Sequence, residues 1–345
     1  IADLEFAAIP DLIEQHARLQ PQHPALSQSG QTLNYAELNQ LMDRVASSLQ
    51  RDGYPPGECV AICAQSSITY MAVYLGALRA GMVVAPLAPG STPDSLDRML
   101  RDSQARVLFL DASTQAGFHP QTLSGLPCVD LGTHSSKTAL VDWLSPVMKR
   151  PSAVKLAPDW AFNIIYSSGT TGEPKGIVQP HSMRWAHVKR GAAYQYSPAS
   201  VTLLSTPLYS NTTLVVLFPT LAYGGHVWLM PKFDALTYLQ LAQDHGVTHT
   251  MLVPVQYQRI MAVPSFDGFD LHTFIMKFCT SAPFSAELKA DVLKRWPGGL
   301  TEFYGMTEGG GTCILEAHLH PDKLHTVGRP APGHDIRLID EHGQE

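Results

Sequence analysis

Residues 166–176 hold the densest group of phosphate-binding side chains in the chain, reading Tyr-Ser-Ser-Gly-Thr-Thr-Gly-Glu-Pro-Lys-Gly. Glycines let backbone N–H groups turn toward a ligand, and hydroxyls and an ammonium supply further donors for polyphosphate oxygens. The segment differs from a Walker P-loop, which has glycine directly before its lysine and serine or threonine directly after it. Here Pro174 and Gly176 occupy these two positions. A flexible surface loop is the plainer interpretation. Lys175 and the apolar run 162–166, which predicts a buried strand, favour a phosphate loop at a strand end.

A second group of candidate residues lies at 303–308, which reads Phe-Tyr-Gly-Met-Thr-Glu and is followed by three glycines. The ring of Tyr304 offers a flat face for a nucleotide base, and the carboxylate of Glu308 is a ligand that Mg²⁺ prefers. Taken singly, Tyr304 is also explained as a core aromatic residue and Glu308 as a solvated carboxylate. Together with the first segment, they predict a magnesium-nucleotide site.

The elements that must position these segments are predicted from the spacing of apolar residues. Asn34 and Glu37 have the spacing of a capping box. The helix that they open has an apolar stripe at Leu38, Leu41, Met42, Val45 and Leu49. Residues 57–62 predict a buried strand, and residues 76–87 predict a helix end, a turn and a strand that ends at Leu87. This alternation predicts stacked βα units around largely parallel sheets, an α/β fold.

The length of 345 residues exceeds the usual size of a single hydrophobic core, so more than one packed subdomain is expected. Prolines and basic residues interrupt the pattern at 145–159, just before the strand that leads into the first segment. We therefore predict an N-terminal α/β subdomain at 1–158 and a second α/β subdomain at 159–345, which carries both candidate segments.

Composition excludes several classes of function. A formal net charge of −6 with 16% charged residues leaves no basic stripe for nucleic acid. The five cysteines are scattered without a CxxC pair, which predicts reduced core cysteines in a cytoplasmic protein. The longest apolar stretch, residues 213–230, contains a proline and a Gly-Gly pair, so it predicts a buried helix, a turn and a strand and no membrane span.

Both candidate segments carry the motifs of a known family. The chain resembles the adenylate-forming (acyl-activating) enzyme superfamily, on its acyl- and aryl-CoA ligase branch. The family's loop pattern is matched without a break at 166–176, and its Tyr-Gly-x-Thr-Glu pattern is matched at 304–308. The resemblance covers nearly the whole chain and corresponds to the family's large N-terminal domain. It implies two packed, mostly parallel sheet-and-helix subdomains, layered αβαβα, which lead into strands of a small β-barrel, with the small C-terminal domain absent.

The chemistry that this resemblance implies is a two-step acid–thiol ligation. A carboxylate attacks the α-phosphate of ATP, pyrophosphate leaves, and the thiol of coenzyme A takes the acyl group. Catalytic roles are implied for Lys175, Thr307 and Glu308, and Mg²⁺ binding for Thr170 and Glu308. The nucleotide-binding residues that it implies are Ser167, Ser168, Gly169, Thr170, Thr171, Gly172, Lys175, Thr280, Ser281, Ala282, Phe303, Tyr304, Gly305, Met306 and Thr307. Those expected at the acyl group are Tyr209, Met306, Gly309 and Gly310.

The substrate expected is a hydrophobic or aromatic carboxylic acid. Peptide-synthetase adenylation domains place an aspartate where this chain has no acidic residue between Arg190 and Phe233. They also carry asparagine where Glu302 stands and proline where Met306 stands. An α-amino acid is therefore disfavoured.

The chain ends at Glu345, where the family continues to a hinge and a C-terminal domain with the adenylation lysine, so the resemblance implies that this fragment alone is severely impaired. Three functions stay open: the CoA ligase, an adenylation domain that loads the phosphopantetheine thiol of a carrier protein, and a non-catalytic nucleotide- or acyl-binding protein. The partners expected are the acid, ATP and coenzyme A, with no nucleic acid and no membrane span; a homodimer is also open.

Overall fold

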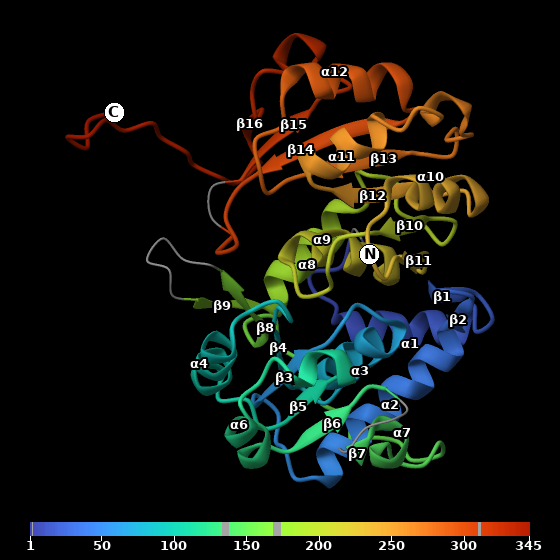
Figure 1. The fold of residues 1–345 in the computed structure, drawn as a ribbon, viewed down its shortest axis with the longest axis vertical. Coiled ribbons are helices and arrows are strands. Elements are labelled where there is room, and N and C mark those ends of the chain that lie inside the picture. The colour runs from blue at the N-terminus through green and yellow to red at the C-terminus, as the bar shows by residue number, and fades with distance from the viewer. Residues whose placement is uncertain (2, 133–137, 168–173, 310–311) are drawn as a thin grey trace. The chain divides into compact units, whose positions relative to one another are not determined.

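The computed structural model describes residues 1, 3–132, 138–167, 174–309 and 312–345. The chain forms two compact units, Ile1–Lys232 and Phe233–Glu345, and Figure 1 shows the elements of each. The division predicted between residues 158 and 159 falls inside the first of these units, and that assignment of subdomains stays a prediction.

The larger sheet of the first unit has the strand order β7-β6-β5-β3-β4-β8-β9. Its neighbouring strands are parallel except for the antiparallel pair β8–β9. Its strands are β3 (Cys59–Cys63), β4 (Val83–Pro86), β5 (Leu108–Leu110), β6 (Cys128–Asp130), β7 (Thr138–Ala139), β8 (Ala161–Ser167) and β9 (Lys175–Pro180). The mostly parallel arrangement agrees with the prediction of βα units.

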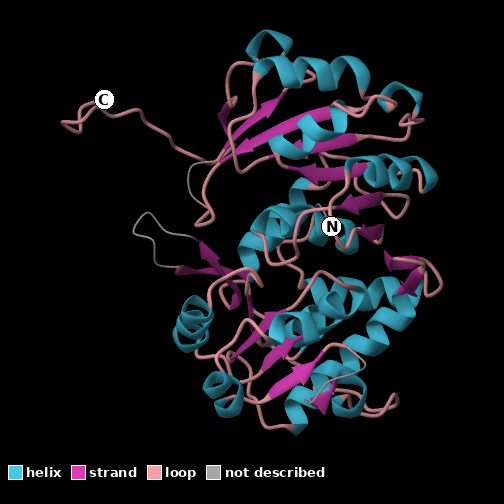
Figure 2. Cartoon of the chain, viewed as in Figure 1, coloured by secondary structure: helices cyan, strands magenta, loops and turns pink. Residues whose placement is uncertain are grey.

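Helices pack on this sheet and on one another, as Figure 2 shows. They are α1 (Ile9–Leu19), α2 (Tyr35–Arg51), α3 (Ile68–Arg79), α4 (Pro93–Ser103), α5 (Ala112–Gln115), α6 (Pro120–Gly125), α7 (Leu140–Trp143), α8 (His181–Arg190) and α9 (Asn211–Ala222). The capping box of Asn34 and Glu37 is confirmed at the start of α2. Helices α2 and α3 meet closely at Gly76, where a Cβ atom would lie 2.5 Å from the Cβ of Val45. Only glycine fits there.

Four further strands of the first unit lie side by side in the order β10-β11-β1-β2: β10 (Val201–Leu204), β11 (His226–Leu229), β1 (Pro24–Gln28) and β2 (Gln31–Asn34). The apolar stretch 213–230 folds as predicted, because α9 ends at Ala222, Gly224 turns the chain at φ +80°, and β11 follows. In the described part of the chain, no helix combines the length and the apolar character that crossing a bilayer needs.

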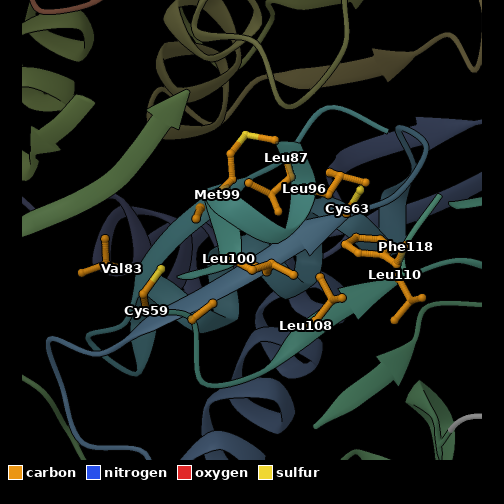
Figure 3. Close-up of a cluster of buried hydrophobic side chains, with 13 residues drawn as sticks. Cys59, Cys63, Val83, Leu87, Leu96, Met99, Leu100, Leu108, Leu110 and Phe118 are labelled. Atoms are coloured by element: carbon orange, nitrogen blue, oxygen red, sulfur yellow. The ribbon is translucent and has the colours of Figure 1, made fainter. Parts of the chain in front are cut away.

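The core beneath α4 is built from alternate residues of neighbouring strands. Cys59, Ala61 and Cys63 of β3 point to one face, as the two-residue period of a strand requires, and meet Leu96 and Met99 of α4. Figure 3 shows this cluster of side chains. Cys59 and Cys63 are free and buried, which agrees with the prediction of reduced core cysteines. Burial raises the pKa of both thiols to about 12.

The second unit contains a sheet segment in the order β16-β15-β14-β13-β12. Its strands are β12 (His249–Leu252), β13 (Met276–Cys279), β14 (Gly299–Tyr304), β15 (Cys313–Glu316) and β16 (Arg329–Pro330), and its helices are α10 (Ala235–Asp244), α11 (Pro254–Met261) and α12 (Ala286–Arg295). The first three strands pair in parallel, whereas β14–β15 and β15–β16 are antiparallel. Among the described residues these strands form no closed barrel.

Candidate nucleotide-binding segments

The first candidate segment joins the two strands of an antiparallel hairpin. Strand β8 ends at Ser167, and Lys175, the first residue of β9, lies opposite it in the ladder. The strand-end position that the apolar run predicts is therefore confirmed. The predicted ligand residues Ser168, Gly169, Thr170, Thr171 and Gly172 lie outside the described residues.

Tyr166 anchors this strand end to helix α4. Its hydroxyl donates to Asp102 Oδ2 at 2.6 Å, and the Met99 carbonyl oxygen lies 3.1 Å away. A Cβ atom on Gly176 would lie 2.9 Å from Asp102 Oδ2 and 3.1 Å from Tyr166 Cε1. The packing of Tyr166 therefore requires glycine at position 176, next to Lys175. The sequence motif alone had suggested phosphate binding as the reason for this glycine.

Lys175 is exposed at the start of β9. Its ammonium forms no ion pair with any residue in the described ranges. Ser167 is half-buried at the end of β8. Of the residues predicted to bind phosphate in this loop, the structure describes these two. They are paired at the end of the β8–β9 ladder.

The second candidate segment also follows a strand of an antiparallel hairpin, between β14 and β15. Tyr304 ends β14 with 59% of its surface exposed, so it is not a core residue. Phe303, beside it, stacks on Phe278 with ring centroids 5.6 Å apart. Thr280 Oγ1 donates to the Phe303 carbonyl oxygen at 2.8 Å. This bond ties the predicted adenine segment 280–282 to the strand that carries the exposed tyrosine.

Ser281 has a backbone φ of +83°, in the left-handed region that favours glycine. Such a conformation costs a non-glycine residue about 1–3 kcal/mol and is often retained at ligand-binding positions. Ser281 and Ala282 are both exposed. A strained, exposed turn beside β14 fits a segment whose backbone contacts a ligand.

A tight turn follows Tyr304. The Gly309 N–H donates to the Met306 carbonyl oxygen at 3.0 Å, and Gly309 has a φ of +83°. A Cβ atom on Gly305 would lie 3.2 Å from Thr312 Oγ1, which is a close contact. The left-handed φ of Gly309 and the close contact at Gly305 therefore explain why glycine occupies both positions. The predicted acyl-binding role of Gly309 stays a prediction, and Gly310 lies outside the described residues.

Side chains around this turn are largely open to solvent. Met306 is 62% exposed, Glu308 is exposed and Thr307 is half-buried. The Glu308 carboxylate forms no ion pair among the residues that the structure describes. An exposed carboxylate and a threonine hydroxyl close in sequence to an exposed aromatic ring have the chemistry that the nucleotide prediction requires.

A buried ion pair that the sequence did not reveal supports β14. Lys289 of α12 is 1% exposed and Glu302 of β14 is 3% exposed. Lys289 Nζ lies 2.5 Å from Glu302 Oε2 and donates to the carbonyl oxygens of Leu324 and Thr326, each at 2.9 Å. Burial raises the pKa of Glu302, and the lysine opposes this shift. The pair fixes β14 two residues before Tyr304.

Tyr209, the predicted acyl-binding residue of the first unit, precedes helix α9. It is half-buried, and burial raises the pKa of its hydroxyl. Thr213 Oγ1 donates within the same turn to the Pro207 carbonyl oxygen at 2.6 Å, which fixes the backbone on either side of Tyr209. The residue is thus held at a helix start and open to one side.

The residues present fit ATP and Mg²⁺ by their chemistry. Within the described ranges, no group of three or more His, Cys, Asp or Glu side chains forms a metal site. Mg²⁺ does not require such a cage, since it is usually held by one or two carboxylates, substrate phosphates and water. Glu308 supplies a carboxylate of this kind, whereas Thr170, its predicted partner, lies outside the described residues.

Comparison with known proteins agrees with this picture. Residues 13–345 match the family described as AMP-binding enzyme. A feruloyl-CoA synthase from Amycolatopsis sp is 30% identical over 338 residues, which cover 96% of this chain and 66% of that protein. A fatty acid–[acyl-carrier-protein] ligase, ScoC, from Streptomyces coeruleorubidus is 27% identical over 346 residues, 96% of this chain and 65% of that protein. The chain thus spans just under two thirds of the length of these relatives.

Among solved structures, the N-terminal domain of FACL13 from Mycobacterium tuberculosis superposes with a TM-score of 0.85 at 22% identity, covering 98% of this chain and 86% of that one. This likeness confirms the predicted α/β fold class. The family match extends over almost the whole chain and includes both motifs from which the resemblance was inferred. The chain therefore belongs to the AMP-binding enzyme family.

Proposed function

We propose that the protein containing this chain uses ATP to activate a hydrophobic or aromatic carboxylic acid and then transfers the acyl group to the thiol of coenzyme A. The observation that carries the proposal is the second hairpin, where the exposed ring of Tyr304, the hydroxyl of Thr307 and the exposed carboxylate of Glu308 follow one another. Membership of the AMP-binding enzyme family and the relative named feruloyl-CoA synthase support it.

The proposed roles follow from the chemistry of each side chain. Lys175 offsets the negative charge that grows on the leaving pyrophosphate, because its own charge is not neutralised by a described residue. Thr307 donates to the α-phosphate, and Glu308 holds Mg²⁺, which supplies positive charge next to phosphate oxygens. Tyr304 presents its ring to adenine, and residues 280–282 border the base.

The substrate class follows from charge. No acidic residue occurs at 191–232, the region that contains Tyr209 and α9, and most of α9 is buried and apolar. A substrate ammonium there would stay unpaired, and an unpaired buried charge costs several kcal/mol. This disfavours an α-amino acid and favours an acid without a positive charge.

The experiment that tests the proposal measures pyrophosphate release by the full-length gene product. Release should require ATP, Mg²⁺ and a carboxylic acid together, and addition of coenzyme A should yield an acyl thioester visible by mass spectrometry. Thr307→Val and Glu308→Gln should each lower kcat/KM by about 100-fold, because each removes a group that stabilises transition-state charge. Glu287→Gln, at an exposed carboxylate of α12, is the matched control and should not change the rate.

Two results would contradict the proposal. Unchanged rates in the Thr307 and Glu308 variants would show that the site is misassigned. Absence of release with every acid would leave a non-catalytic nucleotide- or acyl-binding protein.

A second candidate acceptor is the phosphopantetheine thiol of a carrier protein, which the relative named fatty acid–[acyl-carrier-protein] ligase favours. Offering coenzyme A and a phosphopantetheinylated carrier protein in parallel separates the two, because only the true acceptor should become acylated at a rate matching pyrophosphate release.

A further inference from the structure

A guanidinium lies buried among aromatic rings that α3, β8 and α9 of the first unit contribute. Phe162 and Phe218 contact each other with ring centroids 5.1 Å apart. The Arg184 guanidinium carbon lies 5.7 Å from the centroid of Phe162 and 5.9 Å from that of Phe218. Tyr74 lies against the same two rings, at centroid distances of 6.1 and 5.8 Å. All four side chains are fully buried.

Arg184 has amide partners and no carboxylate among the described residues. Its Nη2 donates to Asn163 Oδ1 at 3.1 Å and to Gln179 Oε1. Its Nη1 has no hydrogen-bond partner within the described chain. Burial lowers the pKa of Arg184 to about 10, which keeps the group charged at neutral pH. A buried charge ordinarily has an ionic partner, and the residues that the structure describes provide none for this cation.

Two buried tyrosine hydroxyls on α3 resemble Arg184 Nη1 in their hydrogen bonding. The hydroxyls of Tyr70 and Tyr74, one helical turn apart, also have no hydrogen-bond partner among the described residues. Buried polar atoms in folded proteins are nearly always paired with protein, with water or with a ligand. Tyr70, Tyr74 and Arg184 are all able to donate, so a group that satisfied them together would be rich in acceptor oxygens.

This cluster reaches the segment that is expected to bind the acyl group. Gln179 Nε2 donates to Asn211 Oδ1 at 3.4 Å, and Asn211 is the first residue of α9, two residues after Tyr209. Burial raises the pKa of Tyr70, and the neighbouring Tyr74, Cys63 and Tyr209 raise it further. Gln179 therefore links the buried arginine to the first residue of α9, two residues after Tyr209.

We propose that Tyr70, Tyr74 and Arg184 form a subsite for a second carboxylate at the far end of the acyl group. The inference rests on the proposed function and narrows its substrate to a dicarboxylic acid. A carboxylate matches the donors because it accepts several hydrogen bonds at once and balances the guanidinium. Phe162 and Phe218 supply apolar faces for the ring or alkyl spacer between the two carboxylates. The lack of acidic residues at 191–232 leaves this charge to the substrate.

The test compares matched pairs of acids with the full-length gene product in the pyrophosphate-release assay: benzoate with terephthalate, and heptanoate with pimelate. The dicarboxylic member of a pair should have a kcat/KM at least about tenfold higher, as expected for a hydrogen bond to a charged group. Tyr74→Phe should remove most of that preference and leave the KM for ATP unchanged. Tyr196→Phe, at a buried tyrosine of the same unit that packs on Tyr223, is the matched control.

Tyr74→Phe carries the test because it removes only an oxygen without a partner in the described chain, so the variant should fold. Arg184→Met should reverse the preference, but it also takes the arginine donor from the buried oxygens of Asn163 and Gln179, of which Gln179 Oε1 keeps Asn163 Nδ2 as a donor. Its melting temperature is therefore measured alongside. A parent enzyme that prefers the monocarboxylic acids, or a preference that survives Tyr74→Phe, overturns the subsite and leaves the ligase function intact.

Loss of turnover with every acid contradicts the proposed function. In that case equilibrium dialysis of terephthalate against the parent and the Tyr74→Phe chain decides the subsite separately. Weaker binding to the variant supports the subsite, and equal or absent binding overturns it.

Discussion

Replacing Lys289 by methionine should destabilise the second unit strongly. The substitution keeps the length of the side chain on α12 and removes only the charge that faces Glu302. The Glu302 carboxylate, 3% exposed, would then remain buried at a site from which its partner at 2.5 Å had been removed. The carbonyl oxygens of Leu324 and Thr326, each 2.9 Å from the ammonium, would lose the same donor.

The magnitude follows from these contacts. Removing one partner of a buried ion pair costs about 3–5 kcal/mol, because the other charge stays unpaired. Each orphaned carbonyl adds up to about 1 kcal/mol. The expected loss in unfolding free energy is therefore about 3–7 kcal/mol, a large share of the ~5–15 kcal/mol typical of a folded protein. The double variant Lys289→Met/Glu302→Leu leaves no charge behind, so only about 1–2 kcal/mol should remain of the loss.

Urea denaturation followed by circular dichroism and tryptophan fluorescence measures these losses; Trp296, at the end of α12, reports on the second unit. Lys294→Met is the matched control, because Lys294 is an exposed lysine of the same helix. Acid should rescue the single variant, because an unpaired, buried Glu302 binds a proton more tightly in the folded chain than in the unfolded chain. As the pH falls from the folded pKa of Glu302 to its unfolded pKa, the variant should recover about 1.4 kcal/mol per pH unit. A Lys289→Met loss below 1 kcal/mol, or one that acid does not reduce, would refute the reasoning.

Three further outcomes are expected. Gly176→Ala places a methyl group 2.9 Å from Asp102 Oδ2 and should lower the unfolding free energy by about 1–3 kcal/mol in urea titrations, whereas an unchanged midpoint would mean that the Tyr166 contact shifts freely. Ser281→Gly relieves the φ of +83° and should raise the unfolding free energy by about 1 kcal/mol; no gain would show that the strain is absent. Burial lowers the pKa of His181 from its ordinary 6.5 to about 4, so the unfolded chain binds the proton more tightly. Stability should therefore fall by up to about 3 kcal/mol from pH 6.5 to 4, and His181→Gln should flatten that part of the pH profile.

Local sequence patterns predicted much of the fold. The capping box at Asn34 and the buried strand, predicted at 57–62 and formed at Cys59–Cys63, depend on residues within one turn or one strand. Their spacing therefore contains the information needed. The helix, turn and strand at 211–229 were readable for the same reason, since proline and paired glycines act on their immediate neighbours. The strand expected to end at Leu87 ends at Pro86, a difference of one residue.

Contacts between distant residues were not readable. Lys277 looks like a surface lysine in sequence, yet it is fully buried and donates to the carbonyl oxygens of Trp296, Pro297 and Gly298. Burial lowers the pKa of Lys277 to about 7, although three acceptors favour the ammonium, since a neutral amine has only two N–H donors. Arg184 is also fully buried, by residues that are distant from it in the sequence.

The sequence predicted the chemical groups of the candidate site better than it predicted their arrangement in space. The exposed ring of Tyr304 and the exposed side chains of Lys175 and Glu308 agree with the motifs, while their ligand roles stay predictions. Sequence spacing did not show that both segments connect antiparallel strands, because strand direction depends on which distant strands pair.

The buried cysteine thiols can report how fast each unit opens. Cys59 and Cys63 lie in the core of the first unit and Cys279 in β13 of the second, and burial raises the pKa of all three. Alkylating reagents attack the thiolate, whose fraction at neutral pH is on the order of 10⁻⁵ for a pKa near 12. Covalent labelling must therefore wait for a local or global opening that exposes the sulfur. Mass spectrometry of the labelled peptides would time the opening of the two units separately in one sample, without any engineered probe.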